Sequence, residues 1–233
     1  MKTPKSTFSA GLAVGTALLC LAGIFAHAQF GGGPATTTIT PPGARPGAGA
    51  ANVDGMIRVS NNGLTDLGKD FAQRAPNVGN RSGGRAKTWG VFDVTFDTAP
   101  EWIDDLSITY FLMLENDKAK QGEKRMSLFT ATFEYADIPG GAMGRDHKAG
   151  VVLPPNTLLR YGKPIGFAVQ FSVGGQSAGD GYGTATGSLR GQDKWWINNN
   201  VIGSEAVQKR TGLIERSKSV FSVADPDSYE VAK

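Results

Sequence analysis

Apolar and polar residues alternate along four stretches of the chain, and this alternation is its clearest structural pattern. It runs through residues 89–97, 106–114, 126–135 and 165–173. A two-residue period is the side-chain repeat of a β-strand, because successive Cβ atoms point to opposite faces of a sheet. One apolar and one polar face is typical of an antiparallel sheet that is covered on one side. The residues predicted to face the core are Phe92, Val94, Phe96, Leu106, Ile108, Tyr110, Leu112, Leu114, Phe129, Ala131, Phe133, Tyr135, Ile165, Phe167, Val169, Phe171 and Val173.

Shorter segments complete an all-β prediction. We expect strands at 56–59, 151–153 and 194–197, whereas the glycine-rich residues 174–191 fit either a loop or a pair of weak strands. Residues 204–216 fit a helix and a strand equally well. About seven short strands, without helices long enough to cross over between them, favour an antiparallel β-sandwich over a βαβ fold.

Two short helices are considered beside these strands. Apolar residues follow helical spacing between residues 64 and 74, so a helix there competes with a loop. Near the end of the chain, Asp225 is followed by Pro226. An aspartate N-cap with proline at the first helical position is typical of a helix start, and it predicts a short C-terminal helix.

The N-terminal segments predict export and a spacer. Residues 1–28 have the organisation of a signal peptide, in which two lysines precede an apolar run that ends at the small-x-small cleavage site Ala26-His27-Ala28. Residues 29–52 are rich in Gly, Pro and Thr and predict a flexible linker, because they carry too little apolar surface to form a core. Residues 53–87 are expected to be a weakly structured lead-in, and residues 88–233 the β-sandwich domain.

Signal cleavage changes the chemistry that the chain can carry. Cys20, the only cysteine, and His27 lie in the signal peptide, so the mature chain is expected to have no disulfide and no thiolate metal site. Cleavage also removes two lysines and no acid, so the net charge falls from +3 to +1. A charge near zero argues against nucleic acid as a partner, and a membrane is expected to bind only the uncleaved signal. The expected location is the periplasm, the outer surface or the extracellular space.

Two single residues were weighed as catalytic groups. Gly175-Gln176-Ser177-Ala178-Gly179 matches the G-x-S-x-G nucleophile pattern, but the residues after Ser177 will not begin a helix and no histidine follows. His147 is the one histidine left after cleavage, and it lies in a charged turn without a second imidazole or a thiolate.

Acidic residues give no better catalytic or metal site. Asp93 and Asp97 share a strand face but lie about 13 Å apart at the rise of a strand, which is too far for a glycosidase pair. The acids between residues 225 and 230 lack the glycine and the register of a calcium loop. The sequence therefore predicts no enzyme, no cofactor and no metal.

Aromatic residues are the best candidates for a binding surface. Trp102, Tyr182, Trp195 and Trp196 are the residues singled out for a partner or a glycan. The adjacent Trp195 and Trp196 would point to opposite faces of a strand, so one is expected in the core and the other exposed or covered by a loop. An exposed tryptophan can stack on a sugar ring or fill a pocket of a partner protein. The alternative is that these rings only complete the core.

Several motifs together give the chain a family resemblance. Their residues, in order, are Trp89, Pro100-x-Trp102, Leu153-Pro154-Pro155, Leu158-Leu159-Arg160-Tyr161-Gly162, Trp195-Trp196, 213–221 and Tyr229. This set resembles the secreted pilus-like proteins of Verrucomicrobia (Akkermansia-type), which are encoded among type IV pilus genes. The resemblance covers residues 89–233 and implies an immunoglobulin-like sandwich.

The resemblance also implies a non-enzymatic role in a pilus-like surface assembly. The implied partners are other pilus-like or envelope proteins, or a second copy that pairs through an edge strand. One feature departs from true pilins, since a cleaved signal removes the apolar helix on which they polymerise. The chain is therefore expected to be an accessory or a differently assembling component. A carbohydrate-binding sandwich that uses an exposed tryptophan is the alternative function.

Overall fold

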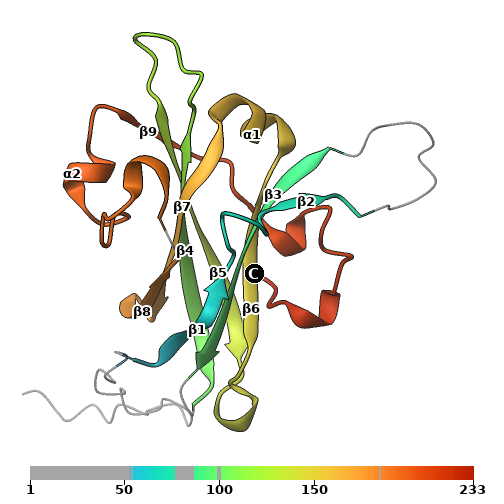
Figure 1. Cartoon of the computed structure of the whole chain (residues 1–233). Coiled ribbons are helices and arrows are strands. Elements are labelled where there is room, and N and C mark those ends of the chain that lie inside the picture. The colour runs from blue at the N-terminus through green and yellow to red at the C-terminus, as the bar shows by residue number, and fades with distance from the viewer. Residues whose placement is uncertain (1–52, 54, 77–86, 99–100, 184) are drawn as a thin grey trace, which may run out of the picture. The chain divides into compact units, whose positions relative to one another are not determined.

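Two β-sheets pack face to face in the computed structural model, which describes residues 53, 55–76, 87–98, 101–183 and 185–233 (Figure 1). The predicted signal peptide (1–28) and linker (29–52) lie outside these residues. Sheet A has the strand order β1-β3-β6-β10, with β2 also paired to β3. Its strands are β1 (Ile57–Leu64), β2 (Ala72–Arg74), β3 (Thr88–Thr98), β6 (His147–Leu153) and β10 (Ile214–Glu215).

Sheet B has the strand order β8-β7-β4-β5-β9. Its strands are β4 (Ile103–Glu115), β5 (Met126–Ile138), β7 (Lys163–Val173), β8 (Gln176–Tyr182) and β9 (Val207–Arg210). All its pairs are antiparallel except β5 with β9, which is parallel. The predicted all-β, immunoglobulin-like sandwich is therefore confirmed.

The four alternating stretches form the central strands β3, β4, β5 and β7, and their apolar faces meet between the sheets. Phe92, Phe96 and Phe167 are fully buried there. The only side-chain polar bond deep in this layer joins the hydroxyls of Tyr110 and Tyr135, 3.0 Å apart, among the described residues. Burial raises the pKa of both hydroxyls well above the ordinary tyrosine value, so both stay protonated.

Ile165 departs from the predicted inward face. The pairing of β4 with β7 shifts register, since Met113 pairs with Gly166 and Leu114 with Pro164, so Ile165 is an extra residue without a partner on β4. Because the side-chain period of a strand is two, a single inserted residue turns the side chain to the other face. Ile165 is buried in a second apolar cluster on the outer face of sheet B instead.

Residues 55–76 belong to the sandwich, which corrects the weakly structured lead-in expected over 53–87. β1 and β2 both pair with β3, so sheet A begins at Ile57 and not after residue 87. Residues 64–74 form the end of β1, a turn and β2, so the helix considered there is wrong. Leu67 is buried and Phe71 stacks on Phe92 at 6.1 Å, so the helical spacing of these residues arises from separate contacts with the core.

The outer face of sheet B is covered by the segment between β8 and β9. This segment holds the 3₁₀ helix η2 (Gly187–Leu189), a turn with the two tryptophans, and helix α2 (Asn199–Ile202), seen in orange at the left of Figure 1. The strand expected at 194–197 is therefore wrong, since these residues form a turn in which Lys194 has a left-handed backbone, φ 44°.

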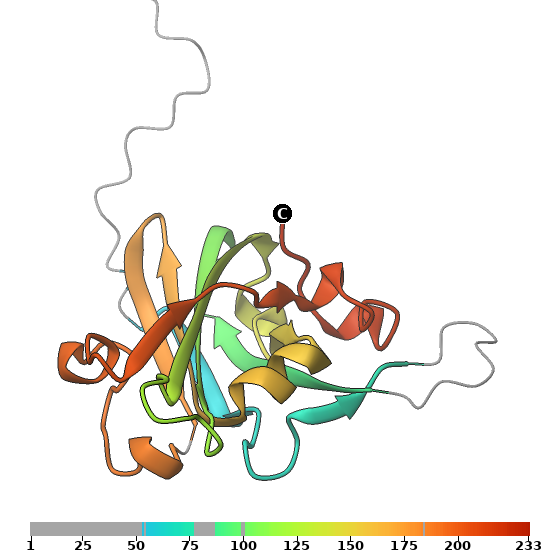
Figure 2. The ribbon, with the colours of Figure 1, turned by 90° about the horizontal axis from the view of Figure 1, so that it is seen from above.

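The outer face of sheet A is covered by the C-terminal segment, drawn in red on the opposite side of the sandwich (Figure 2). It holds the 3₁₀ helices η3 (Arg216–Lys218) and η4 (Pro226–Ser228). The predicted C-terminal helix is thus a single 3₁₀ turn. Asp225 adopts φ 53°, ψ 53° and makes no side-chain cap bond, whereas a helix N-cap needs an extended backbone.

Two further short helices complete the described elements. η1 (Gly141–Met143) lies between β5 and β6, and α1 (Pro155–Tyr161) lies between β6 and β7. Pro155 occupies the first position of α1. A backbone N–H at this position has no acceptor within the helix, so proline loses no hydrogen bond there. Gly162 ends α1 with φ 93° and approaches the backbone of Glu115 so closely that a Cβ would meet the Glu115 carbonyl oxygen at 2.0 Å. α1 is thereby fixed against the end of β4.

Candidate interaction surfaces

The predicted aromatic candidates separate into buried and exposed residues. Trp195 and Trp196 are both buried, at 0% and 1% exposure, so neither ring is exposed, and the expectation that they point to opposite faces of a strand is wrong. Because they lie in a turn rather than a strand, both rings can enter the same cluster, where they meet edge to face at 6.1 Å. Gly166 of β7 leaves room for this, since a Cβ there would lie 2.8 Å from the Trp195 ring.

Trp102 and Tyr182 keep exposed aromatic surface, at 58% and 49%. The Tyr182 ring packs on Trp196 at 4.9 Å, so the structure brings Tyr182 together with the tryptophan pair. Trp102 is not part of that group. Tyr182 is in register with Ala168 and through it with Phe111, nine residues along β4 from Trp102, which corresponds to about 30 Å. The four candidates therefore do not form one site.

The residues considered as catalytic groups, His147 and Ser177, lie in places that suit a structural role. His147 is buried, with Nδ1 2.7 Å from a Glu230 carboxylate oxygen and Nε2 3.1 Å from the Pro139 carbonyl oxygen. These contacts tie the C-terminal segment to β6. Ser177 is exposed within β8, which continues as a strand through Tyr182 instead of forming a nucleophile elbow. Within the described residues, no group of three or more His, Cys, Asp or Glu side chains could hold a metal ion.

Asp93 has a different environment from the solvated strand face expected for it. It accepts a hydrogen bond from the Tyr229 hydroxyl at 3.0 Å, and its other carboxylate oxygen is buried without a partner. Burial raises the pKa of Asp93, while Arg216 and the Tyr229 bond oppose that shift. Asp97 accepts a hydrogen bond from the Asp146 backbone N–H at 3.0 Å, so the two carboxylates take part in separate contacts.

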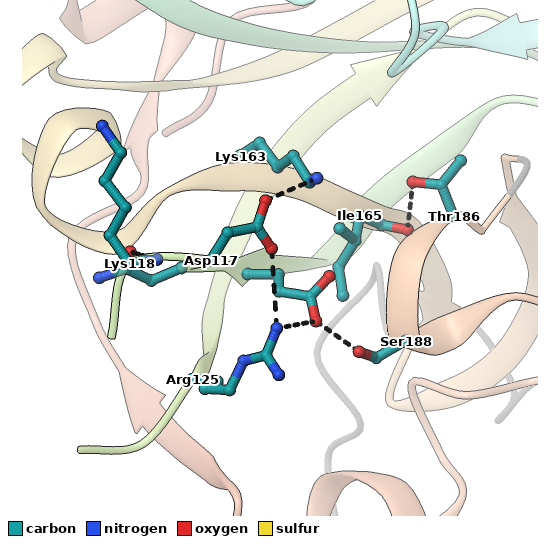
Figure 3. A network of polar contacts seen from close by, with 9 residues as sticks. Asp117, Lys118, Arg125, Lys163, Ile165, Thr186 and Ser188 are labelled. Carbon is teal, nitrogen blue, oxygen red and sulfur yellow. Dashed lines mark hydrogen bonds and ion pairs between the residues drawn. The ribbon is translucent and has the colours of Figure 1, made fainter. Parts of the chain in front are cut away.

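Charged side chains at the end of β4 form a paired network (Figure 3). Lys163 donates to Asp117 at 2.8 Å, which raises the pKa of Lys163 and lowers that of Asp117. Arg125 lies 3.7 Å from Glu115 and 3.8 Å from Asp117, and Ser188 donates to Glu115. Each charged group in this network has a neighbour of opposite charge. The network holds the segment around η2 to the sheet through the contact of Ser188 with Glu115.

A groove next to this network has a different balance of charge. It has a volume of about 930 Å³ and lies between α1, β9 and the outer face of sheet B. Its lining residues are Phe111, Leu128, Phe129, Thr130, Asn156, Thr157, Arg160, Tyr161, Ile202, Lys209, Arg210 and Thr211. We call it the basic groove, because its lining contains three cations and no acid.

The basic groove was not predictable from the sequence pattern. Arg160 lies in helix α1, which the sequence pattern did not predict. Lys209 and Arg210 come from a segment whose secondary structure the pattern left undecided. No single stretch of sequence indicates the groove, because the proximity of Arg160 to Lys209 and Arg210 depends on β9 pairing in parallel with β5.

Comparison with known proteins identifies relatives of this chain. A protein-family model matches residues 68–233, which is more than half of the 233 residues. The chain belongs to the Akkermansia-type family of Verrucomicrobia. The family match begins at Gly68, within the segment that was expected to precede the domain.

A crystal structure of an Akkermansia muciniphila protein has the same fold as this member of the Akkermansia-type family. The two chains share 19% sequence identity with a TM-score of 0.58, and the match covers 76% of this chain and 93% of the other. No curated protein matches the chain. Among the described residues, the helices are too short or too polar to cross a membrane.

Proposed function

We propose that this chain is an exported, non-enzymatic protein that acts through protein–protein contacts, as a component or accessory of a type IV pilus-like surface assembly. Membership of the Akkermansia-type family carries the proposal. Its partners are other pilus-like or envelope proteins, and it works in the periplasm, on the outer surface or outside the cell.

The environment of the potentially reactive side chains supports a role without catalysis. The imidazole of His147 has oxygen neighbours at both ring nitrogens and lies beneath the C-terminal segment. A general base needs a free nitrogen within hydrogen-bond reach of a substrate proton. Ser177 lies on a different sheet from His147. Labelling of Ser177 by a fluorophosphonate probe, with loss of labelling in Ser177→Ala, would contradict this part of the proposal.

The assembly role is tested in cells. The full chain with a C-terminal tag is expressed in its native host, cross-linked, and isolated from separated cytoplasmic, periplasmic and surface fractions. We expect the mature chain outside the cytoplasm, cross-linked to pilus-like or envelope proteins, and present in filaments or complexes by negative-stain electron microscopy. A chain that stays in the cytoplasm, or an exported monomer without cross-linked neighbours, would contradict the proposal.

Carbohydrate binding is the second candidate, and the exposure of Trp102 favours it. Trp102 is 58% exposed just before β4, which leaves aromatic surface on which a sugar could stack. Trp195 and Trp196 are too buried for this role. A glycan array with Trp102→Ala as the control variant separates the two candidates, since binding that the substitution abolishes supports a lectin-like module.

A further inference from the structure

The basic groove collects positive side chains that have no carboxylate within 4.0 Å among the described residues. Arg160, Lys209 and Arg210 are absent from every ion pair there, whereas Arg125, Lys163, Lys194 and Lys233 each have an acidic partner. We infer that the basic groove binds an extended acidic segment of a partner polypeptide. This inference rests on the proposed function, because it names the kind of partner through which the chain makes its contacts.

Arg210 gives the strongest local sign of a missing anion. Its Nε atom is buried without an acceptor in the described structure, while one terminal nitrogen bonds to Gln208. A buried donor without a partner is destabilising, so native structures rarely leave one unused. A carboxylate beside Arg210 would supply an acceptor and a charge of opposite sign.

The two arginines of the groove are already held in place. The Tyr161 ring lies 5.2 Å from the Arg160 guanidinium carbon and 4.3 Å from that of Arg210, and it packs edge-on against Phe129 at 5.5 Å. Cation–π contacts at these distances restrict both guanidinium groups before a ligand arrives. Binding then loses less side-chain entropy, which favours affinity for a carboxylate-bearing partner.

The size and the walls of the groove argue for a ligand with apolar side chains as well as charge. Phe111, Leu128 and Ile202 line it beside the cations. A volume of about 930 Å³ far exceeds the space that one water molecule fills, about 30 Å³, so a small inorganic anion would leave most of the groove in water. A segment that alternates acidic and apolar residues would pair with the cations and cover this apolar surface.

The border of the groove favours a polypeptide over another polyanion. β9 is the last strand of sheet B, and Gln208–Arg210 make no backbone hydrogen bond outside its pairing with β5 among the described residues. A strand edge with free N–H and C=O groups can pair with an extended peptide. Lysine and arginine on an edge also discourage aggregation, and that is their role if no acidic peptide binds.

The test uses the full mature chain and a fluorescein-labelled peptide that alternates glutamate with valine. We expect saturable binding by fluorescence anisotropy that weakens as salt rises. The double variant Arg160→Glu/Lys209→Glu should weaken binding by about tenfold or more, because it places like charges against the peptide. Both side chains are exposed, and circular dichroism checks that the variant folds.

A matched control changes the same charge elsewhere. Arg58→Glu/Arg145→Glu substitutes two exposed arginines outside the groove lining and should leave the affinity within about twofold. Equal weakening by both double variants would overturn the inference, since only net charge would then matter. Retained binding by a peptide with glutamine in place of glutamate would also overturn it, as would tight binding of a sulfated oligosaccharide in place of the peptide.

The outcome is distinguishable from that of the proposed function. Peptide binding is measured on the purified chain and does not depend on export or on an assembly. If the chain binds the acidic peptide but has no pilus-like neighbours in cells, the inference about the basic groove stands and the proposed assembly role is refuted. If the chain is found in the assembly but does not bind the peptide, only the inference about the basic groove is refuted.

Discussion

The two outer faces of this sandwich are covered in physically different ways. On sheet B the cover is apolar, because Trp195 and Trp196 pack with Leu189 against Gly166 and Ala168. On sheet A the cover is held by polar side chains, including the Tyr229–Asp93 hydrogen bond and the stacking of Arg216 on Tyr229 at 4.0 Å. Only a small apolar cluster around Phe221 accompanies these contacts.

This difference indicates which of the two covers should respond to pH. Apolar burial depends little on pH, and its strength follows the area removed from water. Buried charged groups respond to pH, because burial and neighbouring charges change the proton affinity of each group between the folded and unfolded chain. We therefore expect the C-terminal cover of sheet A to loosen as pH rises, while the tryptophan cover of sheet B stays in place.

The largest expected effect is on the apolar cover. Trp195→Ala should lower the free energy of unfolding by about 3–5 kcal/mol, because it opens a cavity over Gly166 that the surrounding turn cannot fill. Urea denaturation monitored by circular dichroism measures the change.

The control is Trp102→Ala, which removes the same side chain from a position that is 58% exposed. It should change the free energy of unfolding by less than about 0.5 kcal/mol. Equal losses in the two variants would show that burial of Trp195 does not stabilise the sandwich.

A smaller effect is expected where the end of the chain contacts β6, beside the inward-facing Phe96. His147→Ala leaves the Glu230 carboxylate and the Pro139 carbonyl without their buried partner, and it should lower the free energy of unfolding by about 1–3 kcal/mol. Hydrogen exchange should localise the loss to the C-terminal segment, with added exchange at Glu230, whose N–H donates to the Lys148 carbonyl oxygen. Uniform exchange across both sheets would contradict a local role.

The central strands of this fold were predictable because the alternation of apolar and polar residues follows which side chains are buried. Phe96, Ile108 and Phe167 each lie between polar or small residues, and each faces the core. The exceptions arise where a contact distant in sequence decides the structure. β1 continues past the strand expected at 56–59, and β2 becomes a strand because β3 offers it an edge. Ile165 changes face at a bulge that only the pairing with β4 creates.

The surfaces were harder to predict for the same reason. The exposure of Trp102 agrees with the surface role considered for it, but two adjacent tryptophans in a turn obey no two-residue period, so Trp195 and Trp196 could both become buried. The basic groove combines Arg160 with Lys209 and Arg210 from segments almost fifty residues apart in the chain. Composition shows that such cations exist, whereas only the topology brings them to one place.

The smallest expected effect concerns Asp93 and has a sign that depends on pH. Burial raises the pKa of Asp93 in the folded protein above its value in the unfolded chain, although Arg216 and the Tyr229 hydroxyl oppose this shift. Its stabilising contribution is therefore fully present below the unfolded pKa, about 3.9, and is lost as pH rises through the folded pKa. Asp93→Asn removes this titration and keeps an amide oxygen that can accept from Tyr229. The variant should match the parent in acid and unfold at a slightly higher urea concentration at neutral pH. A variant that is less stable at neutral pH would show that attraction between the Asp93 carboxylate and Arg216 outweighs the desolvation of that carboxylate, and that the polar cover is held by charge after all.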